Sequence, residues 1–401
     1  MKIIHCADLH LDSRMTSILS ASEARERRAD LLKTFMNMVR SASESSVKAI
    51  LISGDLFDSE RISANARNTV FETILTHPGI LFFYLTGNHE RDGFLNRLSR
   101  RPDNLLTFGP GWKTYTIRVD RAGRPHAEPA GEDDPAGGRI TISGLELNEA
   151  NAPVAAAGLR LSPKDFNIVM LHGQVADYPV KGRPEIIGLH QYANRNIDYL
   201  ALGHVHRYHQ DVLPPGGAWC YPGCLEGRGF DECGEHGYVL LEIEDRSDSR
   251  QQEVPEPNSR KPSGSGFVLN GSFVPVPQRH FHEESVDITD CTSTPVIISK
   301  MERQLDFPAG DLVKAILTGT PDVSGEKNLV QIQNYFNARF FVFRLEDQTR
   351  PAVDYNAYAL DASLKGEFVR TVEEDPDLPE ERKAEIIRCG ILALAGEDTD
   401  L

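Results

Sequence analysis

The sequence predicts an α/β fold with a polar cluster at one edge of a parallel β-sheet. Two observations support this prediction: short apolar runs alternate with helical patterns in the first half of the chain, and several of these runs end in a side chain that can bind a metal. Runs of this length, rich in Ile, Val, Leu and Phe, are typical of strands buried on both faces. The chain of 401 residues, 40% of them apolar, is long enough for two or three domains.

Five apolar runs end in this way. They are Lys2–Ala7, before Asp8 and His10; Val47–Gly54, before Asp55; Ile80–Gly87, before Asn88 and His89; Asn167–Leu171, before His172; and Tyr199–Gly203, before His204 and His206. Because the carboxyl ends of parallel strands share one edge of a sheet, we expect these polar side chains to converge. Buried polar groups are costly without a partner, and this number suits two adjacent metal ions.

Two helices are predicted between the first three strands. The segment Ser22–Ser45 carries an apolar stripe, and Ser20 and Glu23 before it have the spacing of a capping box. The segment Ser63–Thr76 is the second predicted helix, ended by a proline and a glycine.

From Trp112 onward the pattern favours β-structure. Two strand pairs are predicted, and a polar segment, Asp120–Gly138, is interpreted as a surface loop. A smaller unit is predicted to begin near Phe281, and a last helix to cover Pro379–Ala395. The other predicted strands are Tyr115–Val119, Arg139–Leu147, Gly237–Ile243, Phe267–Val276, Val286–Thr289, Pro295–Ile298 and Phe340–Leu345, with a helix over Gly310–Leu317.

Charge and composition limit the function classes. The chain has 43 basic and 59 acidic residues, a net charge of −16, which argues against a surface that binds nucleic acid by charge alone. It contains no apolar run of bilayer length and no signal-peptide pattern, so we expect a cytoplasmic protein without membrane contact. Cys220, Cys224 and Cys233 are interpreted as reduced thiols, because their spacing fits no closed four-ligand zinc pattern.

Spacing within the polar groups suggests how they could share metal ions. Asp8 and His10, like His204 and His206, are two residues apart, and in extended backbone such side chains point the same way. Asp55 lies between the two groups and is the natural carboxylate to bridge two cations. The histidine, carboxylate and amide donors suit manganese most, with iron or zinc as alternatives. Glycines that fit tight turns precede three of these polar residues: Gly54, Gly87 and Gly203.

These polar groups, taken in order, resemble the motifs of calcineurin-like metallophosphoesterases. The motifs are Asp8-x-His10, Gly54-Asp55-x-x-Asp58, Gly87-Asn88-His89-Glu90, His172 and Gly203-His204-x-His206. The resemblance implies a four-layer α-β-β-α sandwich and attack on a phosphodiester by a hydroxide held between two divalent metal ions.

The resemblance also implies residue roles. One metal would be held by Asp8, His10, Asp55 and His206, and the other by Asp55, Asn88, His172 and His204. His89 would donate a proton to the leaving oxygen or stabilise developing charge, and Asp58 would orient it. Glu90 and Arg91 are expected beside the site, where Arg91 contacts phosphates or lies on a solvated helix face.

A narrower likeness is to SbcD-type DNA exonucleases, the nuclease subunits of complexes with an SbcC-type coiled-coil ATPase. The similar segments are His5–Asp12, Asp55–Asp58, Asp198–His204, Tyr221–Gly223 and Gly237–Ile243. This likeness implies a catalytic domain over 1–280, an α+β capping domain over 281–370 that helps select DNA, and an acidic helical tail over 371–401. It also implies an SbcC-like partner and a possible homodimer.

Three functions follow from these observations. The first is a metal-dependent DNA exonuclease or endonuclease in DNA repair. The second is a phosphatase or small-molecule phosphodiesterase, which the acidic charge favours mildly. The third is a mainly architectural subunit whose partner's ATP cycle does the mechanical work. Separately, the predicted helix Pro379–Ala395 carries a stripe of Ile387, Ile391 and Leu394, which either packs in a core or binds the ATPase partner.

Overall fold

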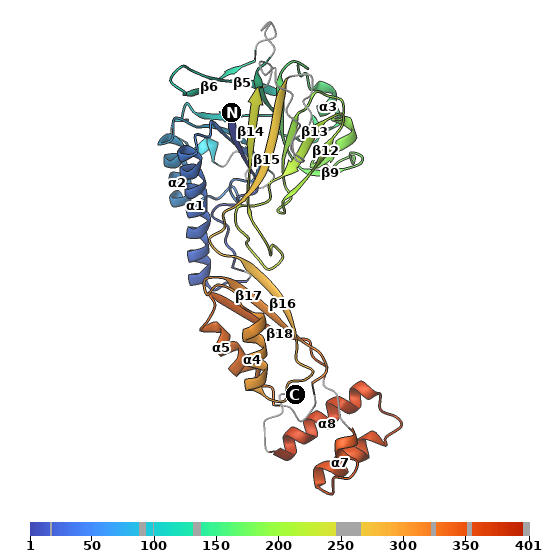
Figure 1. Cartoon of the computed structure of the whole chain (residues 1–401). Helices are drawn as coiled ribbons and strands as arrows, with labels where there is room; N and C mark the ends of the chain where they lie inside the picture. The colour runs from blue at the N-terminus through green and yellow to red at the C-terminus, as the bar shows by residue number, and fades with distance from the viewer. Residues whose placement is uncertain are drawn as a thin grey trace, which may run out of the picture. The chain divides into compact units, whose positions relative to one another are not determined.

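The structure is a computed structural model in which two compact units, 1–278 and 279–401, form separately. Figure 1 shows the course of the chain through the two units. The structure describes residues 1–16, 18–87, 94–98, 100–130, 138–245, 266–321, 326–350 and 355–395.

The first unit contains a six-stranded sheet whose central strands are parallel. In spatial order its strands are β15 (Phe267–Pro275), β14 (Gly237–Asp245), β1 (Lys2–Cys6), β2 (Ala49–Ser53), β3 (Leu81–Leu85) and β4 (Leu105–Thr107). All residues of β2 and β3 are buried, which is why their sequences read as continuous apolar runs. The antiparallel pair of β14 and β15 confirms the predicted pairing of Gly237–Ile243 with Phe267–Val276. The other predicted pair is confirmed as well, because Lys113–Val119 pairs antiparallel with Ile140–Gly144.

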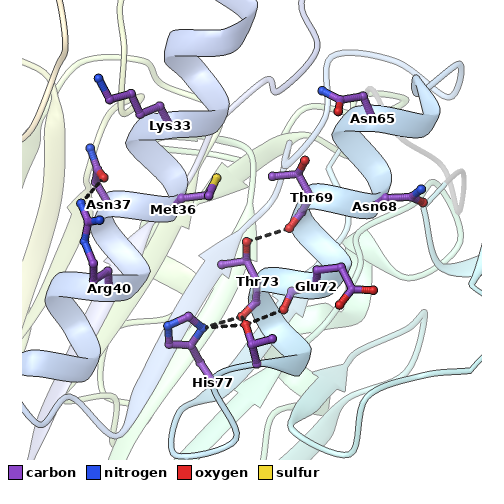
Figure 2. Close-up of a pocket in the computed structure, with 11 residues that line it drawn as sticks. Lys33, Met36, Asn37, Arg40, Asn65, Asn68, Thr69, Glu72, Thr73 and His77 are labelled. Atoms are coloured by element: carbon purple, nitrogen blue, oxygen red, sulfur yellow. Dashed lines mark hydrogen bonds between the residues drawn. The ribbon is translucent and has the colours of Figure 1, made fainter.

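Two helices, α1 (Ala21–Glu44) and α2 (Ala64–Leu75), lie beside this sheet (Figure 1). Both begin within one residue of their predicted starts, and Ser20 and Glu23 form the predicted capping box at the start of α1. A groove of about 770 Å³ runs between them and is lined mainly by polar side chains such as Lys33, Asn37 and Asn68 (Figure 2). None of the predicted metal ligands that the structure describes lines it.

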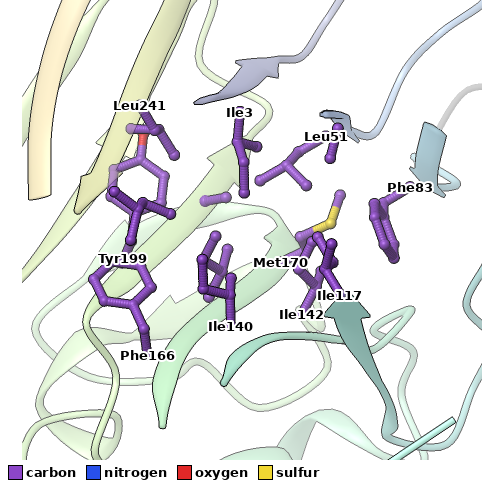
Figure 3. Close-up of a cluster of buried hydrophobic side chains, with 14 of the residues drawn as sticks. Ile3, Leu51, Phe83, Ile117, Ile140, Ile142, Phe166, Met170, Tyr199 and Leu241 are labelled. Carbon is purple, nitrogen blue, oxygen red and sulfur yellow. The ribbon is translucent and has the colours of Figure 1, made fainter. Parts of the chain in front are cut away.

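A seven-stranded sheet packs on the inner face of the first. In spatial order its strands are β12 (His209–Leu213), β13 (Gly217–Tyr221), β11 (Tyr199–Gly203), β8 (Phe166–His172), β7 (Ile140–Gly144), β5 (Lys113–Val119) and β6 (Pro125–Pro129). Side chains from both sheets interdigitate in one core, where Ile3 and Phe83 meet Ile142 and Met170 (Figure 3). Two packed sheets place the carboxyl ends of β1, β2, β8 and β11 near one another.

A second core covers the outer face of the seven-stranded sheet and completes the layers. It buries Leu200 and Leu202 of β11 against Leu159 and Tyr192 from the connecting segments. This confirms the predicted α/β class and the packing of two sheets between helical layers, although the helical cover on this side is short. The connecting elements are η1 (Leu95–Arg97), η2 (Ala152–Val154), α3 (Ala155–Gly158), β9 (Gln174–Ala176), β10 (Ile186–Gly188) and η3 (Leu189–Gln191).

The predicted surface loop Asp120–Gly138 was partly wrong. Strand β6 lies within it and pairs antiparallel with β5, with Ile117 opposite Ala127. The strand was missed because it forms the edge of its sheet and four of its five residues, all but Pro125, are exposed or half-buried, so its sequence has little apolar content.

The second unit contains a three-stranded parallel sheet. Two of its elements were predicted with the wrong type of secondary structure. The segment Pro295–Ile298, predicted as a strand, lies in helix α4, and most of Gly310–Leu317, predicted as a helix, lies in strand β17. Packing overrode local propensity, because Ile297, Ile298 and Met301 lie on one face of α4 and are buried against the sheet. The elements are β16 (Phe281–Asp287), α4 (Thr294–Gln304), β17 (Leu312–Thr318), α5 (Leu329–Asn337) and β18 (Val342–Asp347).

The C-terminal segment folds into short helices rather than a lone helix. These are α6 (Tyr355–Tyr358), α7 (Leu364–Glu373) and α8 (Glu380–Ala395), of which α8 was predicted. Ile387 and Ile391 are buried against Val369 of α7, whereas Leu394 of the same stripe is exposed. Two of the three stripe residues therefore serve a small core.

No helix within the described ranges is long and apolar enough to cross a membrane. All six cysteines lie in the described part of the chain and are free thiols. Of the three clustered cysteines, Cys220 and Cys224 are buried and Cys233 is half-buried.

Candidate metal centre

The predicted ligands that the structure describes gather where strands of the two sheets end. Asp8 follows β1, Asp55 follows β2, His172 ends β8 and His204 follows β11. Asp8, Asp55 and His172 are buried, so their placement is set by the packing of the two sheets rather than by solvent.

One group of possible ligand atoms comes from Asp8, His10 and His206. One atom from each residue lies within 4.8 Å of the others. The Nε2 atoms of His10 and His206 are 3.2 Å apart. Two chain segments far apart in sequence, one after β1 and one after β11, thus present donors to one point.

A second group comes from Asp8, Asp55 and His172, again with their atoms within 4.8 Å of one another. Asp55 Oδ2 lies 3.3 Å from His172 Nε2 and 3.9 Å from His10 Nε2. Asp8 therefore belongs to both groups, and the Asp55 carboxylate lies between a histidine of each. This geometry supports the bridging position proposed for Asp55.

His204 and His206 do not face the same point, contrary to the expectation from their spacing. The His204 ring packs edge-on against His172, with ring centroids 5.5 Å apart, whereas His206 faces His10. The expectation assumed extended backbone, but His204 has φ of 102°. Its backbone N–H instead donates to both carboxylate oxygens of Asp8, at 2.9 Å each.

Unusual backbone conformations concentrate at this cluster. Asp8, His10 and Asp55 have φ of 52°, 43° and 50°, a region that non-glycine residues rarely occupy. Strain of this kind costs on the order of 1–3 kcal/mol per residue and is found mainly at functional sites. Asp8 and His10 meet because of this left-handed backbone, not because of an extended one.

Two of the glycines singled out in the sequence allow close approach here. A Cβ on Gly87 would lie 2.0 Å from Asp55 Oδ1, and a Cβ on Gly54 would lie 2.0 Å from His172 Nδ1. Gly54 also has φ of 99°. Any side chain at either position would displace a candidate ligand.

Four predicted site residues, Asn88, His89, Glu90 and Arg91, lie outside the residues that the structure describes. Asp58, predicted to orient His89, has its described contacts elsewhere. Its Oδ1 is 3.3 Å from His10 Nδ1 and accepts a hydrogen bond of 3.0 Å from Arg228. The roles assigned to these residues stay predictions.

The arrangement of the histidine nitrogens fits bound cations. His172 Nδ1 is 2.9 Å from the carbonyl oxygen of Ser53, which can only accept, so this nitrogen carries the proton. In the neutral imidazole the buried Nε2 would present its lone pair toward Asp55 Oδ2 at 3.3 Å, a repulsion that a proton removes in the metal-free protein. A positive ion between them would relieve that repulsion, and imidazole with carboxylate suits manganese, iron or zinc.

The electrostatics of the cluster point the same way. Burial raises the pKa of Asp8 to about 6 and lowers the pKa of His10 to about 4, so both charged forms are disfavoured. Burial also opposes protonation of His172, but the carboxylates of Asp55 and Asp8 outweigh it and raise its pKa to about 9. In the metal-free protein, protons held by His172 and Asp8 offset the buried negative charge, and a divalent cation would replace those protons.

Sequence reasoning missed two residues that contact the ligands, Arg228 and Glu232. Glu232 Oε1 is 2.7 Å from His206 Nδ1, and Arg228 donates to Glu232 and to Asp58. They lie in the segment between β13 and β14, which has no apolar periodicity. The only pointer was the neighbouring Tyr221–Gly223 segment, which was noted for its resemblance alone.

A buried histidine beside the centre, His5 of β1, should make stability depend on pH. It lies 2.9 Å from the Tyr199 hydroxyl, and burial lowers its pKa to about 3. The unfolded chain binds this proton near pH 6.5, so the stability contribution is present above pH 6.5 and lost as the pH falls toward 3. In metal-free protein, His5→Gln should flatten the unfolding free energy against pH by up to about 1.4 kcal/mol per pH unit in this window.

Urea unfolding at several pH values between 4.5 and 7 measures this slope. His126→Gln, on the exposed strand β6, is the matched control for loss of a histidine. Parallel curves for His5→Gln and the wild type would contradict the prediction.

Comparisons with known proteins agree with this geometry. Residues 1–208 match the family model of calcineurin-like phosphoesterases. The chain is 28% identical over 262 residues to the DNA double-strand break repair protein Mre11 of Methanopyrus kandleri, and 27% identical over 259 residues to the Mre11 protein of Saccharolobus solfataricus. It is 29% identical over 252 residues to the uncharacterized metallophosphoesterase YhaO of Bacillus subtilis.

These alignments are partial on both sides. They cover 60–61% of this chain, and 54%, 60% and 57% of the Methanopyrus, Saccharolobus and Bacillus proteins. This chain therefore matches less than two thirds of the length of each relative. The predicted resemblance is confirmed at the level of the family, and the match lies within the unit that contains the candidate metal centre.

Proposed function

Because the chain belongs to the calcineurin-like phosphoesterase family, we propose that it is a metal-dependent phosphodiesterase that cleaves DNA during repair. One observation carries the proposal: five described carboxylate and imidazole ligands, four of them buried and three of them on left-handed backbone, converge where two sheets end. Two relatives named as DNA double-strand break repair proteins favour DNA as the substrate.

In this proposal the two ions are held by the predicted ligands, including Asn88, for which the sequence is the support. When bound, the ions supply an activated water and neutralise charge on the phosphoryl group. The chain's own residues orient the donors: Ser53 holds the tautomer of His172, and the backbone of His204 holds both oxygens of Asp8. His89 would donate a proton to the leaving oxygen.

The second unit is the proposed capping domain and partner-binding region. Its sheet strand β16 is rich in acidic residues, so it does not offer a basic surface for the DNA backbone. We propose that an SbcC-like ATPase supplies most of the DNA affinity and contacts the helices α7 and α8, where Leu364 and Leu394 are exposed. The likeness to SbcD-type exonucleases also leads us to propose that the chain forms a homodimer.

The substrate class is tested by comparing DNA with simple esters. With Mn²⁺, we expect defined linear DNA and bis(4-nitrophenyl) phosphate to be hydrolysed with kcat/KM at least about tenfold above that for 4-nitrophenyl phosphate. The ATPase partner should accelerate cleavage of DNA but not of the small diester. The first measurement is release of labelled nucleotides from DNA at low and moderate salt.

A preference for the monoester would instead favour a phosphatase. The name of the Bacillus relative, an uncharacterized metallophosphoesterase, is compatible with that function too. Absence of hydrolysis of every ester, by protein that binds Mn²⁺, would favour an architectural subunit.

A further inference from the structure

The two histidines that face each other across the first ligand group are each backed by a carboxylate. Asp58 Oδ1 is 3.3 Å from His10 Nδ1, and Glu232 Oε1 is 2.7 Å from His206 Nδ1. Arg228 Nη2, which can only donate, also lies 3.1 Å from His206 Nδ1, but the Glu232 oxygen is closer, so this Nδ1 carries the proton toward the carboxylate. The Asp58 carboxylate, which can only accept when ionised, favours the same tautomer in His10, and each Nε2 then keeps its lone pair for a cation. The carboxylates thus select the tautomer that can bind metal.

One side chain, Arg228, connects these two carboxylates. Its Nη1 donates to Asp58 Oδ1 at 3.0 Å, and its Nη2 donates to Glu232 Oε1 at 2.9 Å. These are the same two oxygen atoms that contact the imidazoles. Because a guanidinium is planar and rigid, its fork sets the separation of the oxygens, and through them the separation of the rings.

Arg228 is itself held in place from two directions. Its backbone N–H donates to Glu232 Oε2 at 2.8 Å, which closes the turn between the two residues. Two residues earlier, buried Glu226 accepts a hydrogen bond of 2.9 Å from Arg27 of α1, whose side chain is also fully buried. The segment that carries Arg228 is therefore attached to helix α1 by a buried ion pair.

We infer that Arg228 is a positioning residue that, through Asp58 and Glu232, fixes the tautomer and spacing of His10 and His206 for metal binding. The inference rests on the proposed metal-dependent function, but it concerns metal affinity rather than turnover. A competing role, in which Arg228 binds a substrate phosphate directly, is disfavoured because both Nη atoms are already engaged by carboxylates.

The test is a calorimetric titration of chelator-stripped full-length protein with MnCl₂ alone, which measures the affinity for Mn²⁺. Arg228→Gln should weaken Mn²⁺ binding by about 10–100-fold, the usual effect of losing such an outer contact. Arg228→Lys keeps the charge but cannot bridge two carboxylates, so it should lose most of the same affinity. The double variant Arg228→Gln/Glu232→Gln should lose less than the sum of its single variants, because both break one linkage.

A spectroscopic readout separates positioning from folding. Nitrogen-15 NMR of the imidazoles in metal-free protein should show one tautomer for His10 and His206 in the wild type and mixed tautomers in Arg228→Gln. Arg139→Gln is the matched control. Arg139 pairs with Asp165 where β7 and β8 begin, at the end of these strands away from His172. Its loss should therefore lower the melting temperature without changing Mn²⁺ affinity.

The outcomes are distinguishable from failure of the proposed function. Wild-type protein that binds no Mn²⁺ would overturn the metal-dependent function itself. Wild-type protein that binds Mn²⁺ while Arg228→Gln binds it equally well would overturn the inference alone. Unchanged Mn²⁺ affinity with a raised KM would assign Arg228 to the substrate instead.

Discussion

Replacing Asp55 by asparagine should abolish most metal binding and lower phosphodiester hydrolysis by about 10³-fold or more, since bound ions contribute several kcal/mol to such reactions. The Asp55 carboxylate is 2% exposed and lies between His172 Nε2 and His10 Nε2. The amide keeps the shape but removes the negative charge that two cations would share. Metal content after dialysis and kcat for a diester are the measurements.

The control for this change is Asp165→Asn. Asp165 is equally buried and binds Arg139 through both carboxylate oxygens, but it precedes β8 and so lies at the opposite end of the strand from His172. It should destabilise the fold while leaving metal content intact. Asp55→Asn protein that keeps its full metal content and activity would remove the basis for a bridging carboxylate.

Replacing His89 by glutamine should lower kcat on DNA by about 10²–10⁴-fold, the contribution expected of a positioned proton donor. Metal content should not change, because the resemblance assigns metal binding to its neighbour Asn88. A proton donor matters most when the leaving group is a poor one. The loss should therefore be much smaller for a 4-nitrophenyl diester than for DNA.

Comparing the two substrates distinguishes the two roles proposed for His89. A loss that is equal for both leaving groups would show that His89 stabilises charge on the phosphoryl group rather than donating a proton. Full activity of His89→Gln on DNA would contradict both roles.

The fold of the first unit was predictable because its determinants are local. Strands β2 and β3 are buried on both faces, so their apolar runs identify them without any tertiary information. Helix α1 has a capping box that defines its start within one residue. The second unit was harder, because α4 and β17 are short and their apolar residues fit either period until packing decides.

The position of the candidate ligands was predictable for the same reason, but their pairing was not. Each ligand stands after a recognisable strand, and parallel strands end at one edge. Which imidazole faces which depends on positive φ values at Asp8, His10 and His204. A residue such as histidine rarely adopts them, so extended backbone does not explain how Asp8 meets His10 or why His204 and His206 lie beside different imidazoles.

By itself, the sequence determined the family, the parallel strands and the polar residues that follow them, because burial on both faces leaves a continuous apolar run at each strand. Only the tertiary structure decided how the histidines are oriented. Arg228 and Glu232 lie in an aperiodic segment, which a buried ion pair between Arg27 and Glu226, 199 positions apart, attaches to α1. A contact at that separation depends on the whole chain being folded, and no local pattern of residues encodes it.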